Sequence, residues 1–369
     1  MKARNLILPG IVLAALGVMV SCSDAIYSII ENEKKIITST LPLTVSIFDI
    51  ANSAPGGPYY VAAGGVFRGT FNPDGTIGWY PSDTSRPLNP SGSPICNAMV
   101  YYVPTGTLWG GFVNSSGSPA LYQSTAGLTF DGQSPIINAA IAGKQAIVLQ
   151  VANGHIFMVS TKDTLTYELD ENANGGVVWT VQKTISTPIA GIGWDGTHYW
   201  MAAGSVVYSD AADPPAFASA GTSTLGGITI GSTINGVFVD PVNPGRIFFS
   251  TKSDGIVYSI DGGATWKQIS RDVIGSVIVS NLCVAGPVDA AKDKYLVGSD
   301  GFGYYTLSVS GIGMSRFGDS TVALYAESVP RILVEGANVF VGTNMTGLWR
   351  AVFDTALGQL ASGQAWVHE

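Results

Sequence analysis

The chain has 369 residues, of which 46% are hydrophobic and only 12% are charged, and it contains 46 glycines. Few charges with many glycines and aromatic residues are typical of short strands joined by tight turns, which excludes a mainly helical protein and a disordered one. The formal net charge of −8 excludes the basic surface that nucleic-acid binding requires, so we expect no nucleic-acid partner.

Residues 1–21 predict a signal peptide. Lys2 and Arg4 give a positively charged start, and an apolar stretch follows over residues 6–20. This stretch is short for a membrane span of roughly 20 residues. The sequence Met-Val-Ser-Cys22 resembles a lipobox, the processing motif of bacterial lipoproteins, with methionine where leucine is usual. The resemblance implies lipidation of Cys22 and export to the bacterial cell envelope; an ordinary secretory signal or an uncleaved anchor is the alternative.

Residues 22–43 are expected to form a lipid-anchored tether before a folded domain over residues 44–369. The segment either stays outside the fold or adds an outer strand that helps to close it. The chain ends just after Trp366, so we expect closure to depend on its last strand.

Short apolar runs recur along residues 44–369, each followed by a turn signal. The clearest copy has runs at 236–240, 246–251 and 255–261, and a fourth run begins at Trp266. The second run is an aromatic residue followed by small residues, which suits a strand packed tightly between neighbouring sheets. It recurs at 60–64, 200–204, 295–298 and 340–343. The third run recurs at 65–68, 120–122, 165–167, 206–208, 303–305 and 347–350.

An aromatic residue begins the fourth run in every copy. Successive copies are 51, 49, 38, 49, 51 and 49 residues apart, a mean of about 48, and four short strands in such a unit are typical of one propeller blade. The sequence therefore predicts an all-β protein, a single β-propeller of seven four-stranded blades. Cys96 and Cys283 then fall on non-adjacent blades, so we expect two buried thiols. The seven aromatic residues are Trp79, Phe130, Trp179, Phe217, Trp266, Phe317 and Trp366.

One turn carries a specific motif. The segment Ser259-Ile-Asp261-Gly-Gly263-Ala-Thr265-Trp266 resembles an Asp-box, also called a BNR repeat. We expect Asp261 to accept hydrogen bonds from backbone N–H groups of its own turn, where glycine permits positive φ. The resemblance implies a structural role at the blade periphery. Families with this repeat include sialidases, other glycoside hydrolases, sortilin-type receptors and photosystem-assembly scaffolds, so the fold leaves the function open.

An enzyme is the alternative hypothesis. A sialidase resemblance implies an Arg-Ile-Pro motif, which the sequence lacks, and ordinary glycosidases need two facing carboxylates about 5 to 10 Å apart. The three histidines show no metal-ligand spacing and no cofactor motif is convincing, so we expect no catalytic residue, metal or cofactor. The acids available to a sialidase-like or other glycan-processing enzyme are Asp195, Asp240, Asp254, Asp300 and Glu335.

The sequence favours a cell-envelope lipoprotein that contacts the membrane through its N-terminal lipid and binds a protein or a glycan without catalysis. We expect the ligand on the face formed by loops between second and third strands and between blades, because these loops are polar and unlike one another. The ligand's identity and the oligomeric state stay open. The candidate binding residues are Asn114, Lys252, Asp254, Asp300, Asn344 and Trp194.

Overall fold

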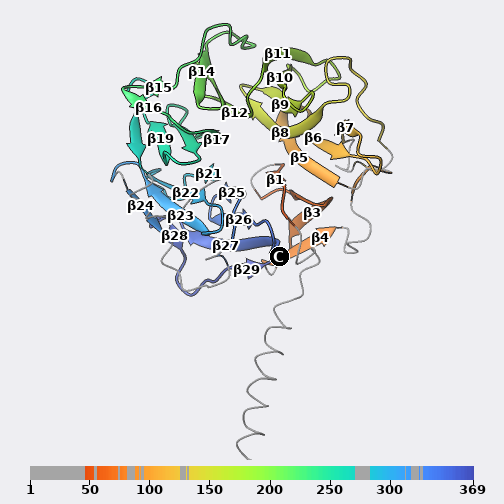
Figure 1. Ribbon diagram of the computed structural model, residues 1–369. Coiled ribbons are helices and arrows are strands. Elements are labelled where there is room, and N and C mark those ends of the chain that lie inside the picture. Colours follow the sequence, from red (N-terminus) through yellow and green to blue (C-terminus); the bar gives the residue numbers. More distant parts are fainter. Residues whose placement is uncertain are drawn as a thin grey trace, which may run out of the picture. The chain divides into compact units, whose positions relative to one another are not determined.

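The computed structural model describes residues 46–369 apart from 54–55, 74, 81–87, 91, 93–94, 125–129, 131–132, 271–282, 312, 317–323 and 325–326. The predicted signal peptide, Cys22 and the tether therefore lie outside the described residues. Within the described part, antiparallel sheets follow one another along the chain, and the first strand of each contacts the first strand of the next (Figure 1). The first strand of the last sheet contacts that of the first sheet, which closes the ring. The predicted seven-bladed β-propeller is confirmed.

Blades 1 to 4 span the first half of the ring. The described residues contain no helix with the length and apolar character that a membrane crossing requires, and the one short helix is η1 (Val103–Thr105). The strands of these blades are β1 (Asp49–Asn52), β2 (Tyr59–Ala63), β3 (Gly65–Phe71) and β4 (Ile77–Tyr80); β5 (Ile95–Tyr102), β6 (Thr107–Val113) and β7 (Pro119–Gln123); β8 (Gln145–Ala152), β9 (His155–Thr161), β10 (Tyr167–Asn172) and β11 (Thr180–Ile185); and β12 (Ile189–Trp194), β13 (Tyr199–Ala203) and β14 (Val206–Asp210).

Blades 5 to 7 follow a small hairpin of β15 (Thr224–Leu225) and β16 (Ile228–Thr229). In each blade the strands pair in sequence order, except that β29 pairs with β27 in blade 7, and the first strand is innermost. The strands are β17 (Ile234–Val239), β18 (Ile247–Thr251), β19 (Ile256–Ser259) and β20 (Lys267–Ile269); β21 (Cys283–Ala285), β22 (Lys294–Gly298), β23 (Tyr304–Ser308) and β24 (Gly313–Arg316); and β25 (Arg331–Glu335), β26 (Asn338–Gly342), β27 (Leu348–Asp354), β28 (Gln359–Leu360) and β29 (Val367–His368).

Blade 4 departs from the predicted pattern. The sequence predicts a fourth strand beginning at Phe217, but Phe217 lies in no strand and has a φ of 46°. The preceding Pro214 and Pro215 carry no N–H for a strand ladder. The carboxylate of Asp210 instead accepts hydrogen bonds from the N–H of Phe217 at 2.7 Å and of Ala216 at 3.0 Å. The segment is therefore held as a loop. Phe130 of blade 2 also lies in no strand.

The fourth-run aromatic residues nevertheless share one packing role. Each one that the structure describes lies in or against the apolar cluster between its own blade and the preceding blade, and all are buried except the half-buried Trp266, while Phe317 is outside the described residues. This common position explains the regular spacing in the sequence, because each junction needs one large side chain to fill it. The aromatic residues at these junctions are Trp79, Phe130, Trp179, Phe217, Trp266 and Trp366.

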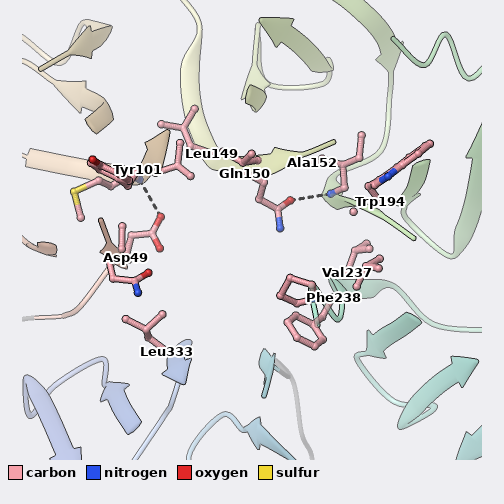
Figure 2. Close-up of a pocket in the computed structure, with 18 of the residues that line it drawn as sticks. Asp49, Tyr101, Leu149, Gln150, Ala152, Trp194, Val237, Phe238 and Leu333 are labelled. Atoms are coloured by element: carbon pink, nitrogen blue, oxygen red, sulfur yellow. Dashed lines mark hydrogen bonds between the residues drawn. The ribbon is translucent and has the colours of Figure 1, made fainter. Parts of the chain in front are cut away.

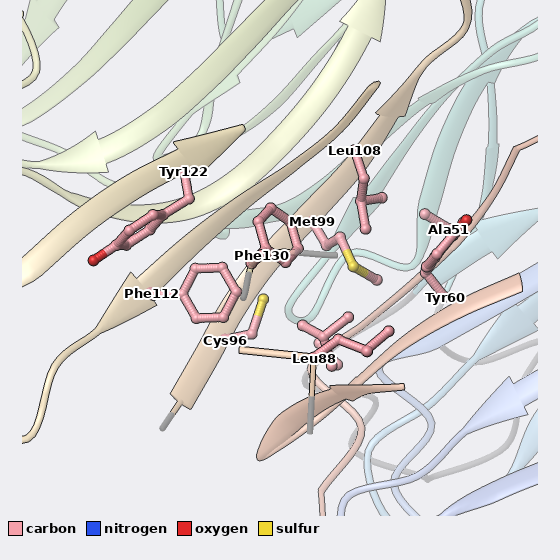
Figure 3. Close-up of a cluster of buried hydrophobic side chains, with 11 residues drawn as sticks. Ala51, Tyr60, Leu88, Cys96, Met99, Leu108, Phe112, Tyr122 and Phe130 are labelled. Atoms are coloured by element: carbon pink, nitrogen blue, oxygen red, sulfur yellow. The ribbon is translucent and has the colours of Figure 1, made fainter. Parts of the chain in front are cut away.

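An apolar cluster fills every junction between neighbouring blades. Figure 3 shows the one between blades 1 and 2, where Tyr60 and Leu108 lie on opposite sides of the junction. Cys96 is a free, buried thiol in this cluster, and burial raises its pKa. Cys283 begins β21 in blade 6, so the two cysteines lie on non-adjacent blades, as predicted.

Small residues let the blades approach closely. A Cβ added to Gly298, at the end of β22, would lie 2.2 Å from the carbonyl oxygen of Val329 before the next blade. A Cβ on Gly342, at the equivalent end of β26, would lie 2.6 Å from Ile47 of blade 1. The small residues after each second-run aromatic therefore have the predicted packing function.

The turn between β19 and β20 is organised by Asp261. Its carboxylate accepts hydrogen bonds from the N–H of Thr265 at 2.8 Å and from the hydroxyls of Thr265 and Ser259. The Ser259 hydroxyl in turn accepts from the N–H of Gly263, whose φ is 88°. Trp266 then packs between blades 4 and 5. Hydrogen bonds, first those from Thr265, lower the pKa of Asp261 to about 2.

We expect Asp261→Ala to lower the free energy of unfolding by about 1 kcal/mol at pH 7, since the turn is solvent-exposed and loses its central acceptor. A carboxylate with a lowered pKa stabilises the fold above its unfolded pKa of about 4 and loses that contribution as the pH falls towards 2. The difference between wild type and variant should therefore shrink between pH 4 and pH 2. Urea unfolding across this range measures it. Asp261→Asn, which keeps one oxygen acceptor, is the control and should cost less at pH 7.

Candidate functional site

The innermost strands surround a cavity along the axis of the ring (Figure 2). Its volume of about 500 Å³ lies within the range of ligand-binding pockets. The lining comes from β1, β5, β8, β12, β17 and β25, and it reaches the carboxyl ends of these strands at Asn52, Asn153 and Trp194. The cavity therefore lies towards the end of the ring that carries the turns between first and second strands. We call this the cavity end, and the end with the loops between second and third strands the opposite end.

Asp49 is the only acidic residue in the described lining, which contains no lysine, arginine or histidine. Its carboxylate accepts hydrogen bonds from the backbone N–H of Met99 at 2.9 Å and of Ile50 at 3.0 Å, and Arg331 Nε lies 3.3 Å away. Burial raises the pKa of Asp49, and the Arg331 guanidinium opposes this effect. Because both oxygens are engaged, Asp49 joins blades 7, 1 and 2 and is not poised for acid–base chemistry.

Gln150 reaches from blade 3 into the cavity. Its Oε1 accepts a hydrogen bond from the N–H of Ile192 in blade 4 at 2.8 Å (Figure 2). Ile192 directly follows a bulge in β12, and Met99, the partner of Asp49, directly follows the corresponding bulge in β5. These bulges turn a backbone N–H towards the preceding blade, where a side chain accepts it. Among the described residues, the side-chain amide nitrogen of Gln150 has no acceptor and can donate within the cavity.

Apolar side chains form most of the wall. Trp194 is half-buried at the cavity end, and its ring centroid lies 4.5 Å from that of Tyr199. Phe238 and Leu333 line the wall from blades 5 and 7, and Val151 is 41% exposed at the end of β8. An apolar wall with a few fixed polar groups suits a binding site in which apolar contact supplies affinity and hydrogen bonds supply orientation.

Tyrosine–carboxylate pairs hold the cavity end rigid. Tyr295 of blade 6 donates to Asp240 of blade 5 at 2.6 Å, and Arg246 donates to the same hydroxyl at 2.9 Å. Burial and the hydrogen bond to Asp240 raise the pKa of Tyr295. Tyr199 donates to Asp213 at 2.7 Å. Because such hydrogen bonds to charged groups span neighbouring turns, the mouth of the cavity is preformed.

The sequence-predicted binding residues are divided between the two ends of the ring. Trp194 lines the cavity, whereas the other five lie in the loops of the opposite end. Lys252 and Asn344 are exposed there. The five residues belong to blades 2, 5, 6 and 7, and they are Asn114, Lys252, Asp254, Asp300 and Asn344.

Three of these five side chains hold loops of this end in place, Asn114 within its own loop and Asp254 and Asp300 against a loop that precedes the first strand of a blade. Asn114 Oδ1 accepts from the N–H of Ser118 at 2.7 Å and from two groups of Ser116. Asp254 Oδ2 accepts from the N–H of Ser232 at 2.7 Å and of Gly231 at 3.0 Å, and Asp300 accepts from the hydroxyl of Ser328. Such contacts are typical of turn-forming Asn and Asp.

The acids that the enzyme hypothesis requires do not converge. Asp195 and Asp240 are buried in first-to-second-strand turns of blades 4 and 5, and Glu335 lies at the corresponding turn of blade 7. Asp195 accepts from the indole N–H of Trp200 at 2.6 Å and from the N–H of His198 at 2.7 Å. Asp254 and Asp300 lie at the opposite end, and none of the five lines the cavity. In the described part of the chain, no cluster of His, Cys, Asp and Glu is suited to a metal ion.

The third strand of blade 3 carries buried charge that sequence analysis missed. Glu168 and Asp170 in β10 are less than 5% exposed, and both contact the buried Lys144. The next residue, Glu171, has its carboxylate 2.6 Å from Nδ1 of His155. The other ring nitrogen of His155, Nε2, lies 3.1 Å from the carboxylate of Asp213. The Tyr-Glu-Leu-Asp-Glu-Asn sequence of this strand, unusually acidic in a chain with so few charges, was the available signal.

No protein-family model matches the sequence, and comparison with curated proteins finds no relative. The fold is similar to YCF48 bound to a D1 peptide, with a TM-score of 0.57 and 15% identity over 85% of this chain and 94% of the other. A chain of the mitotic checkpoint complex has a similar fold, with a TM-score of 0.55 and 13% identity over 85% of this chain and 90% of the other. YCF48 from Cyanidioschyzon merolae has a TM-score of 0.55 and 15% identity over 85% of this chain and 97% of the other. At these identities the likeness shows a shared fold, and the chain is a seven-bladed β-propeller.

Proposed function

We propose that this protein is a lipid-anchored, non-catalytic propeller that binds a segment of a partner protein in its axial cavity. The observation that carries the proposal is the axial cavity, which mostly apolar side chains line together with polar groups that donate and accept hydrogen bonds, and whose described lining includes a single, already paired carboxylate. The complex of a similarly folded propeller with a peptide supports a peptide as the ligand. A glycan is the second candidate, favoured by Trp194, because an indole face stacks well on a sugar.

The described cavity offers little for glycoside hydrolysis, the alternative function. That reaction needs an acid and a second carboxylate about 5 to 10 Å apart. The lining supplies Asp49 alone, and its two oxygens are occupied by backbone N–H groups and Arg331. A binding role therefore accounts better for this site.

The first test is a binding screen of the full-length chain in detergent against a peptide array and a glycan array. We expect peptide hits, and we expect Trp194→Ala to weaken them at least tenfold, since aromatic side chains in such pockets are frequent binding hot spots. Lys252→Ala, at the opposite end, is the matched control and should bind as wild type does. Hits confined to the glycan array, or loss of binding in Lys252→Ala but not in Trp194→Ala, would contradict the proposal.

The anchor is tested separately through Cys22. The described chain begins at the opposite end, where the N–H of Ile47 donates to Thr343 at 2.9 Å and the hydroxyl of Ser46 donates to Asn344 at 2.5 Å. These contacts join the start of the described chain to blade 7. We expect Cys22→Ser to move the protein from the membrane to the soluble fraction of bacterial cells, as measured by fractionation and palmitate labelling, while Cys96→Ser leaves it in the membrane.

A further inference from the structure

The cavity wall is a ring of unpaired strand edges. Each first strand pairs only with the second strand of its blade, so every other residue turns its N–H and C=O towards the axis. One such residue in β12 is Ile192, which donates its N–H to Gln150. In β5 the corresponding residue is Met99, which donates its N–H to Asp49. Leu149 holds the same position in β8, directly after the bulge at residues 146–148.

The edge of β8 lacks the side-chain cap that its neighbours have. No side chain of the described residues accepts from the N–H of Leu149, and the blade 2 residues Ala98 and Val100, which share an apolar cluster with Leu149, carry no acceptor in their side chains. The register of β8 places Val151 two residues further along, with its own N–H and C=O also turned to the axis. Val151 is 41% exposed. Gln150, whose side-chain amide is a donor, stands between Leu149 and Val151 in the sequence. The edge of β8 is therefore open at the mouth of the cavity.

We infer that the occupant of the cavity is an extended, uncharged or basic peptide segment of a partner protein, which pairs through its main chain with the edge of β8 at Leu149 and Val151. This inference rests on the proposed function and names the chemistry of the ligand. Main-chain pairing fits because the edge offers both N–H donors and C=O acceptors at strand spacing, which is the pattern of another strand. A sugar or an anion would satisfy only part of it.

The charge of the site selects against acidic segments. The described lining holds one carboxylate and no cationic side chain, and the whole chain has a formal net charge of −8. An Asp or Glu entering this space would lose much of its hydration without gaining a cationic partner. Alternate side chains of the bound strand would instead face Trp194 and the apolar wall, so apolar residues at every second position fit the site.

Val151→Pro tests the main-chain pairing directly. Val151 and its partner Ile156 form a pair without hydrogen bonds, because the Ala152 and His155 pair closes the two-residue turn; proline at 151 removes only the N–H that faces the axis. Val334→Pro is the matched control, since Val334 holds the same position before the two-residue turn of blade 7. Gln150→Glu is a second, near-isosteric variant, which keeps an oxygen for Ile192 and replaces the donor with a negative charge.

The probes are peptides selected from a random 12-residue phage library on the full-length protein in detergent, then synthesised with and without N-methylation at alternate residues. We expect selected sequences poor in Asp and Glu, and a loss of affinity of at least tenfold for Val151→Pro, for Gln150→Glu and for the N-methylated peptides. Val334→Pro should stay within twofold of wild type. If the peptides bind Val151→Pro and the wild type equally but do not bind Trp194→Ala, the strand pairing is wrong and the proposed function stands. A library that yields no binder, with glycans bound instead, overturns both.

Discussion

Lys144→Met should lower the free energy of unfolding by about 3 to 5 kcal/mol at pH 7, which is a large part of the stability of an average domain. Lys144 is 7% exposed, and its ammonium group contacts Glu168 and lies 2.6 Å from Asp170. Methionine retains the length of the side chain and removes its charge, so both buried carboxylates lose their main cation. The cost is that of uncompensated buried charge and not of a cavity.

The penalty of Lys144→Met should decrease as the pH is lowered from 7 to about 4.5. In the wild type, Lys144 and Lys162 outweigh burial and lower the pKa of Glu168, whereas at Asp170 burial prevails over Lys144 and raises the pKa. Without Lys144 both values rise, so both carboxyl groups take up protons in the folded state at a higher pH. A folded state that binds more protons than the unfolded one gains stability as the pH falls.

Chemical unfolding of the two proteins at pH 7 and pH 4.5 measures this difference. Lys162→Met is the matched control: Lys162 Nζ lies 3.4 Å from the same Glu168, but its side chain is 60% exposed. A partly exposed ion pair contributes little, so the control should lose less than about 1 kcal/mol. Equal losses in the two variants, or a penalty for Lys144→Met that is independent of pH, would show that Lys144 does not neutralise the buried pair.

The blade pattern was predictable from the sequence because it depends on residues close together in the chain. Apolar runs bounded by glycine-rich turns place β2, β13 and β22 correctly, since each run carries its own strand and turn signals. The aromatic residue at the start of each fourth run marks the junction it fills, as Trp179 and Trp266 show. The failure at Phe217 has a local cause as well, because the two prolines before it were visible in the sequence.

The cavity was not predictable in the same way. Gln150 and Ile192 meet across 42 positions, and Asp49 and Met99 across 50. The bulges that turn these N–H groups towards the axis leave no clear mark in the sequence, because no special residue type is required. Trp194 was found because an aromatic residue at a strand end is conspicuous. Residues such as Gln150 and Val151 look ordinary until the ring brings them to the axis.

Packing of Trp366 between the last two blades provides the second large effect. We expect Trp366→Ala to lower the free energy of unfolding by about 3 to 5 kcal/mol. Trp366 is 5% exposed in the cluster between blades 6 and 7, where its ring lies 5.4 Å from that of Tyr304 and 6.1 Å from that of Phe353. Three residues further along the chain, the carboxylate of Glu369 lies 2.6 Å from Nε of Arg350 and 3.5 Å from the indole nitrogen of Trp79 in blade 1.

Thermal and urea unfolding of Trp366→Ala measures this loss, and Val367→Ala is the control. The comparison separates the packing of the Trp366 ring from the effect of any truncation near the end of the chain. Val367 is 51% exposed, so its truncation should cost less than about 0.5 kcal/mol. Trp366→Phe should recover most of the loss, because the indole nitrogen has no hydrogen-bond partner in the described structure and the ring's packing is what counts. If Trp366→Ala unfolds as the wild type does, the Trp366 ring does not stabilise the junction between blades 6 and 7.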